Sequence, residues 1–167
     1  MPAPVSAVSH IALLTRDFAR LSAFYADVFE AHDPYGRTGG DRAGGLGFIA
    51  IGEAIVLHVF ERPGGSLGGL DDELARRPLA RGRIDHFSLE AADLDGFLVI
   101  RDRLLAREAS DGSVTDFGPL VSLFFTDPDG FQGEVSLTKT PGWDPPFDVE
   151  PARRQPPEGL APGVAAT

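Results

Sequence analysis

Four side chains that could bind a divalent metal ion stand at corresponding positions in the two halves of the chain. His10 and His86 are 76 residues apart, and so are His58 and Glu134. Imidazole nitrogen and carboxylate oxygen are common ligands of divalent cations. If the two halves pair about a pseudo-twofold axis, these positions converge, and we therefore predict one metal site made by all four. The remaining histidine, His32, falls outside this set, and we expect it to be solvated.

The 76-residue spacing extends well beyond these four residues. Residues 8–13 align with 84–89, and 48–49 with 124–125, with no net insertion between them. A chance match would hold locally and then drift, so we interpret the pattern as a tandem duplication.

Each repeat has the pattern of a strand, a helix and further strands. Alternating residues predict the first strand, and an aspartate followed by apolar residues at helical spacing predicts the helix. The turn at 127–130, Asp-Pro-Asp-Gly, strongly favours a hairpin between the last two strands. The fold class is therefore α+β, with two tandem βαβββ modules. The expected strands cover 7–14, 46–51, 54–61, 83–90, 120–126 and 130–137; the expected helices begin at Asp17 and at Asp93 or Asp95, the second ending near Arg107.

Three further segments connect or follow these elements. The glycine-rich stretch 36–47 has room for a short strand, and the linker 62–82 for one helical turn at 70–76. Residues 139–167 form a proline-rich tail that contains the only tryptophan, Trp143. We favour an arm that wraps and stabilises the body or a dimer; the alternative is that Trp143, Pro145 and Phe147 cover the mouth of the site.

Packing alone explains the four candidate ligands poorly. A single histidine on a strand is more often a core residue than a metal ligand. Packing does not explain why three histidines and one glutamate fall on one repeat-related set. A buried Glu134 on an apolar strand is also costly without a partner charge or a metal.

The composition excludes several classes of function. The net charge of −10 argues against nucleic-acid binding, which needs a basic surface. No apolar run approaches the length needed to span a bilayer, and the N-terminus lacks the features of a secretory signal. The chain has no cysteine, so it has neither disulfides nor thiolate ligands. We expect a cytoplasmic protein.

Residues 8–13, 84–89 and 125–135 resemble the vicinal oxygen chelate superfamily, which includes glyoxalase I, fosfomycin resistance proteins, extradiol dioxygenases and bleomycin resistance proteins. The resemblance covers roughly residues 5–138, the Asp-Pro-Asp-Gly turn before Glu134 being its most specific part. It implies a domain at 1–138, with module one at 5–61, linker 62–82 and module two at 83–138. The two modules would form a curled mixed sheet around the metal.

The resemblance also implies which residues bind the metal. His10, His86 and Glu134 match the family's ligands and give a two-histidine, one-carboxylate set that favours Fe(II), with Mn(II), Ni(II) or Zn(II) as alternatives. At the position of His58, glyoxalase I usually has glutamate, and methylmalonyl-CoA epimerase, another member of the superfamily, usually has glutamine. His58 is therefore a fourth ligand or a catalytic base, and we favour the ligand. Glu134 and His58 are the candidate catalytic residues. Glu90 is a candidate base that is better explained as a solvated strand end.

Three functions remain open. The first is an enzyme, a lyase, isomerase or dioxygenase, that binds one divalent metal per chain and a small substrate through vicinal oxygens. The second is a metal-free protein that sequesters an antibiotic, as bleomycin resistance proteins do. The third is a scaffold that the metal only stabilises. We also expect a homodimer.

Overall fold

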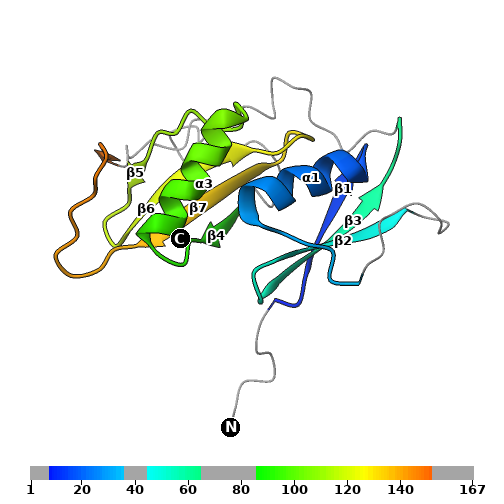
Figure 1. Cartoon of the computed structure of the whole chain (residues 1–167), viewed down its shortest axis with the longest axis horizontal. Helices are drawn as coiled ribbons and strands as arrows, with labels where there is room; N and C mark the ends of the chain where they lie inside the picture. The colour runs from blue at the N-terminus through cyan, green and yellow to red at the C-terminus, as the bar shows by residue number, and fades with distance from the viewer. Residues whose placement is uncertain (1–7, 36–44, 65–85, 152–167) are drawn as a thin grey trace, which may run out of the picture.

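The computed structural model describes residues 8–35, 45–64 and 86–151 of the chain. Its elements form two modules that lie side by side, each with one helix packed on one sheet (Figure 1). The α+β class predicted from the sequence is confirmed. The described strands form two mixed sheets, one of three strands and one of five.

The first module contains β1 (Ile11–Thr15), α1 (Phe18–Phe29), β2 (Leu46–Ile51) and β3 (Ile55–Glu61). The strand order is β1-β3-β2, with β1 parallel and β2 antiparallel to β3. The possible strand within 36–47 falls largely on residues outside the described ranges.

The second module contains β4 (Phe87–Glu90), α3 (Leu94–Ala106), β5 (Thr115–Asp116), β6 (Leu120–Thr126) and β7 (Gln132–Thr138). The order β4-β7-β6-β5 is extended by β8 (Glu150–Pro151), which comes from the tail and pairs with β5. The expected helical turn at 70–76 lies outside the described residues.

The strand registers of the two modules confirm the duplication. In the first sheet His58 is opposite Ala12 on one side and Phe48 on the other. In the second sheet Glu134 takes the same place, opposite Ser88 and Phe124. Ser88, Phe124 and Glu134 each lie 76 positions after their counterparts in the first sheet, so the 76-residue repeat of the sequence is also a repeat of the strand pairing.

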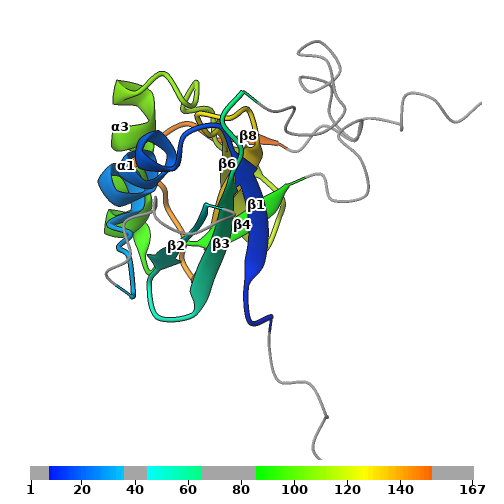
Figure 2. The same cartoon turned by 90° about the vertical axis from the view of Figure 1, so that its right-hand side faces the viewer.

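Both helices begin where the sequence predicts. Asp17 caps α1 by accepting a hydrogen bond from the Arg20 backbone N–H, and Asp93 caps α3 in the same way with Gly96. The sequence allowed Asp93 or Asp95, and the structure selects Asp93. Both helices lie on the same side of the sheets (Figure 2), where one buried core spans the two modules. No helix of the described chain is long and apolar enough to cross a membrane.

The first strands are shorter than predicted. β1 begins at Ile11 and β4 at Phe87, so His10 and His86 immediately precede their strands and do not lie within them. Both histidines keep equivalent places, one residue before the first paired residue of their strands, Ile11 and Phe87. Alternation of side chains does not by itself show where backbone pairing begins.

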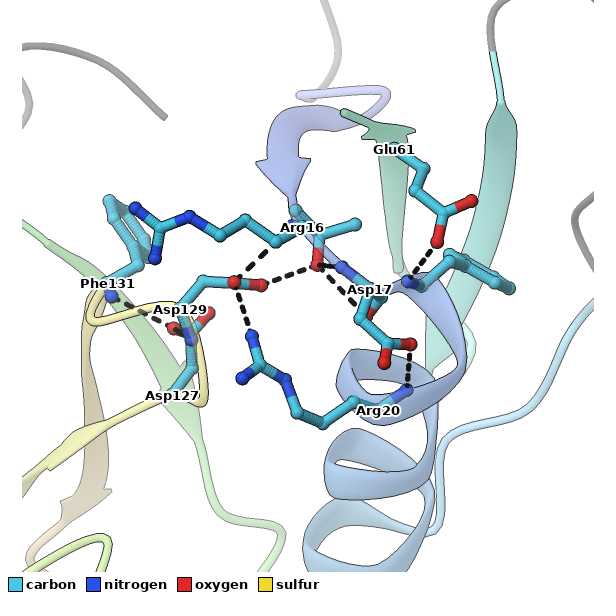
Figure 3. Close-up of polar contacts among 9 residues, drawn as sticks. Arg16, Asp17, Arg20, Glu61, Asp127, Asp129 and Phe131 are labelled. Atoms are coloured by element: carbon cyan, nitrogen blue, oxygen red, sulfur yellow. Dashed lines mark hydrogen bonds and ion pairs between the residues drawn. The ribbon is translucent and has the colours of Figure 1, made fainter. Parts of the chain in front are cut away.

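A buried polar junction joins the modules at the turn between β6 and β7 (Figure 3). The Asp129 carboxylate accepts hydrogen bonds from the Thr15 hydroxyl at 2.5 Å and from the Arg20 guanidinium at 2.6 Å. The Asp129 side chain is only 4% exposed, whereas the Arg20 side chain is 48% exposed. The turn that leads into β7 is therefore fixed to the end of β1.

The same turn contains a buried carboxyl group. Asp127 accepts hydrogen bonds from the backbone N–H groups of Asp129 and Phe131, both at 2.9 Å. Burial raises the pKa of Asp127 to about 6, although these hydrogen bonds act in the opposite direction. Burial, followed by the charge of Asp127, raises the pKa of the Tyr25 hydroxyl.

The described part of the tail packs on the body on the helix side. Phe147 stacks on the buried Phe97 of α3 with ring centroids 5.8 Å apart, and Arg101 lies over the same ring. Trp143 and Val149 pack against the same core. This placement agrees with a wrapping arm and puts Phe147 on the face of the module that carries α3.

Candidate metal centre

The structure arranges the four predicted ligands as two pairs. His10 and His58 form one pair, and His86 and Glu134 form the other, so each module contributes two residues from equivalent positions. Among residues 8–35, 45–64 and 86–151, no group of three or more histidine, cysteine or acidic side chains is close enough to hold a metal ion. The convergence of all four is therefore not achieved by the described part of a single chain.

The pair in the second module is within hydrogen-bonding distance, which is also the separation of two neighbouring metal ligands. The Nε2 atom of His86 lies 3.1 Å from Oε2 of Glu134. Two donors at about 2.1 Å from one ion, with angles of about 90° to 110°, are about 3.0 to 3.4 Å apart. The Glu134 side chain is 13% exposed and that of His86 is 31% exposed, so both remain accessible.

The pair in the first module is a stack of imidazoles. The rings of His10 and His58 are parallel within 5°, with centroids 3.8 Å apart. The lone pair of an imidazole nitrogen lies in the ring plane, so two stacked rings do not direct both lone pairs at one ion. Because His10 is exposed, its ring can turn without disturbing the core. The donor types of the four residues fit a divalent cation.

The protonation state of His58 also suits a ligand. Partial burial, followed by the neighbouring His10, lowers the pKa of His58 below its usual value. The neutral imidazole, which is the form that binds a metal, is therefore favoured. A neutral imidazole can equally accept a proton, so both predicted roles of His58 remain chemically possible.

The surfaces around the two pairs differ in polarity. On the sheet face of His58 the neighbours are apolar: Phe48 contacts its ring at a centroid distance of 4.9 Å, and Tyr35 contacts Phe48 in turn at 4.8 Å. On the sheet face of Glu134 the neighbours are Phe124, which lies opposite it, and Ser88 and Ser136, whose hydroxyls are 3.2 Å apart. The helices lie on the opposite side of both sheets.

A shallow hollow of about 530 Å³ lies between the segment that follows α3 and the end of β6. Phe124, which forms part of it, contacts the His86 ring edge-to-face at 5.5 Å. The polar groups of the hollow include Glu108, Asp111 and Gln132. Neither His86 nor Glu134 is among the residues that line this hollow.

The other two candidates lie outside both pairs. The Glu90 side chain is exposed at the end of β4 and accepts a hydrogen bond from the Thr138 hydroxyl at 2.5 Å. This agrees with a solvated strand end. His32 is also exposed, and its backbone bridges to Ala50.

Sequence reasoning missed the inter-module junction. The sequence at 127–130 predicts a hairpin turn, but nothing local to it indicates contact with Thr15 and Arg20, more than 100 residues away. The only local signal of this contact is Asp129 itself. The hydrogen bonds within the turn use the Asp127 side chain as acceptor, so the turn does not require a second aspartate.

Comparison with known proteins gives relatives of the fold. No protein-family profile and no curated protein sequence matches the chain. A glyoxylase/bleomycin resistance protein/dioxygenase domain from Frankia sp. EAN1pec is similar in structure, with a TM-score of 0.66 and 20% identity over 82% of this chain and 95% of that one. Lactoylglutathione lyase from Agrobacterium tumefaciens has a TM-score of 0.54 and 23% identity over 84% of this chain and 100% of that one.

A third similar structure contains a metal. It is a mutant of the fosfomycin resistance protein FosX from Listeria monocytogenes in complex with Mn(II) and 1S,2S-dihydroxypropylphosphonic acid. Its TM-score is 0.58, with 20% identity over 81% of this chain and 94% of that one. Together with the tandem modules and their shared register, these similarities show that the chain has the same fold as these glyoxalase/bleomycin resistance/dioxygenase domain proteins.

Proposed function

We propose that the protein is a metal-dependent enzyme that binds a small substrate through two adjacent oxygen atoms. The observation that carries this proposal is the 3.1 Å approach of His86 Nε2 to Glu134 Oε2, matched in the other module by the contact between His10 and His58. The FosX complex with Mn(II) and a diol supports the same chemistry for this fold.

His10, His58, His86 and Glu134 would hold the ion. When bound, a divalent cation acts as a Lewis acid on chelated oxygens or, if it is Fe(II), as a redox centre. The two-histidine, one-carboxylate subset favours Fe(II), with Mn(II), Ni(II) and Zn(II) as alternatives. Reaction types open to such a site are those of a lyase, an isomerase or a dioxygenase.

Two chains would assemble the complete ligand set. Thr15 and Asp129 fix the end of β1 to the start of β7, and the two strands lead away from this junction in different directions (Figure 1). His10 lies five residues before Thr15, and Glu134 five residues after Asp129, so the pairs separate within one chain. In a homodimer, the His10–His58 pair of each chain would face the His86–Glu134 pair of the other, giving one ion per chain.

His58 acts as a ligand in this proposal. His58 occupies the strand register in the first module that Glu134 occupies in the second. A side chain must be placed where it can reach the ion, and only then does its pKa decide which role it can take. If a ring rotation at His10 does not occur, only one of the two stacked rings can bind the ion, and the other is left as a proton acceptor.

A metal-free binding protein is the second candidate. The observation that favours it is the apolar surface around His58, on which a stacked pair of imidazoles could serve as a platform for a planar antibiotic. In that case the His86–Glu134 pair would have no role in binding.

Metal titration separates the two candidates. Protein stripped of metal should bind close to one Zn(II) per chain by calorimetry. Because changes even in residues that support a ligand cost about 10- to 100-fold in affinity, Glu134→Ala and His58→Ala should each weaken binding by about 100-fold or more. His32→Ala is the matched control and should bind zinc like the unaltered protein. Zinc binding unchanged in Glu134→Ala would refute the metal centre.

A further inference from the structure

A second cavity lies at the seam between the two modules, on the side of the sheets that carries both helices (Figure 2). Its volume is about 300 Å³, and its walls come from the C-terminal end of α1, the turn between β2 and β3 and one face of α3, with β4 and β7 as the floor. Val135 lines the cavity, and its neighbour Glu134 faces the other side of β7, because side chains alternate along a strand. The cavity is therefore separate from the candidate metal centre.

The spacing of residues on α3 explains how one wall forms. Four residues of this helix line the cavity, and their separations of three, four and seven positions place them on one helix face: Gly96, Val99, Ile100 and Arg103. Val99 is 45% exposed, although it belongs to a helix that packs on the core. This face of α3 thus borders a space that the described residues leave open.

The interior of the cavity is apolar. Its floor includes Leu89 and Val135, which are buried, and the buried Val28 of α1 lies on its wall. A hydrocarbon group placed there would leave water for apolar surroundings, which is favourable. Sites for small molecules have volumes of about 300 to 1,000 Å³, so this cavity fits a short-chain compound and is too small for a peptide helix.

Arg103 is the one basic residue among the described residues that line the cavity. Its guanidinium donates hydrogen bonds to the Val28 carbonyl at 3.2 Å and to the Glu30 carboxylate at 2.8 Å. The Glu30 side chain is 76% exposed, so its ion pair with Arg103 contributes little to stability. The carboxylate of a ligand could therefore replace that of Glu30 on Arg103 at small cost, leaving Glu30 in solvent.

The other acidic residue at the cavity does not oppose a bound anion. Glu90 accepts a hydrogen bond from the Thr138 hydroxyl, and Thr138 shares the face of β7 that carries Glu134. The Glu90 carboxylate therefore points away from the helix side of the sheet. Arg103 is left as the charged group that defines where the polar end of a ligand would lie.

We infer that this cavity binds a small monocarboxylic acid, whose carboxylate pairs with Arg103 and whose hydrocarbon chain lies on Val28, Leu89 and Val135. The bound acid would lie behind the strand that carries Glu134, on the opposite face of the sheet. The site uses none of the candidate metal ligands, so the inference does not depend on the proposed function.

Octanoate and 1-octanol test the inference on the full chain without added metal. The two compounds have chains of the same length and differ in their polar ends. Calorimetry should show saturable binding of octanoate. Arg103→Met should weaken octanoate binding about ten-fold, as expected for the loss of a hydrogen bond between charged groups, and leave 1-octanol binding unchanged. Arg103→Lys keeps the positive charge and should restore most of the affinity for octanoate.

A second variant makes the test specific to this cavity and independent of Arg103. Val99→Asp places a negative charge at the edge of the cavity and should weaken octanoate binding about five-fold or more. Leu105→Asp is the matched control, because Leu105 is an exposed aliphatic residue of the same helix, 38% exposed, that does not line the cavity. It should bind octanoate like the unaltered protein.

Three results would overturn the inference. One is the absence of saturable octanoate binding to the unaltered protein. Another is an equal loss of octanoate and 1-octanol binding in Arg103→Met, because Arg103 would then not pair with the carboxylate. The third is octanoate binding that Val99→Asp leaves unchanged, because the acid would then lie elsewhere on the protein.

Discussion

The junction at Asp129 should contribute far more to stability than an ion pair on the surface. The change to test is Asp129→Asn, which keeps the shape of the side chain and removes its charge. Asp129 is almost fully buried and accepts hydrogen bonds from Thr15 and Arg20. A hydrogen bond to a charged group contributes about 1 kcal/mol more than a neutral one, so two of them predict a loss of about 2 kcal/mol.

The chain contains a matched control for this change. Asp27 on α1 pairs with Arg107, the residue that caps the end of α3, so this ion pair also joins the two modules, but both of its side chains are well exposed. Exposed ion pairs contribute about 0 to 1 kcal/mol. Urea unfolding should therefore show about 2 kcal/mol of destabilisation for Asp129→Asn and less than about 1 kcal/mol for Asp27→Asn. Equal effects of the two changes would show that the junction is not what holds the modules together.

Two further predictions concern the same turn and strand. The pKa of Asp127 is raised from 3.8 to about 6 in the folded protein, so the folded state binds the carboxyl proton more tightly than the unfolded state does. The free energy of unfolding should therefore fall as pH rises between about 4 and 6. Asp127→Asn should remove up to about 2 to 3 kcal/mol of that fall. An unchanged pH profile of urea unfolding in Asp127→Asn would contradict this. Gly133→Ala should destabilise the fold by about 1 to 3 kcal/mol, because an added Cβ would lie 2.2 Å from the buried Phe125 ring. Gly96→Ala, on the first turn of α3, is the control; thermal melting of both would show whether only Gly133 is sensitive.

Much of the fold could be predicted because the duplication is encoded locally. The equivalent strand registers of His58 and Glu134 follow from a constant spacing and the alternation of side chains. Asp17 and Asp93 are recognisable as caps because short acidic side chains satisfy the free N–H groups of a helix start.

The relation between the modules could not be predicted in the same way. A repeat shows which positions are equivalent, but the angle between two modules depends on contacts distant in sequence, such as Thr15 with Asp129 and Phe29 with Phe125. The prediction that four ligands converge assumed a closed arrangement about a twofold axis. In the described chain the same residues form two separate pairs. That both pairs bind one metal ion remains a prediction about the dimer.

Mixing two defective variants tests the central claim most directly. One chain carries His10→Ala and His58→Ala, and the other His86→Ala and Glu134→Ala, so neither has a complete ligand set. If a metal ion is held by one pair from each chain, a mixed dimer has one site with all four ligands and one with none. Zinc titration of the isolated mixed dimer should give one tightly bound ion per dimer, while each variant alone binds none tightly. Absence of tight zinc binding in the mixed dimer would contradict a metal centre shared between two chains.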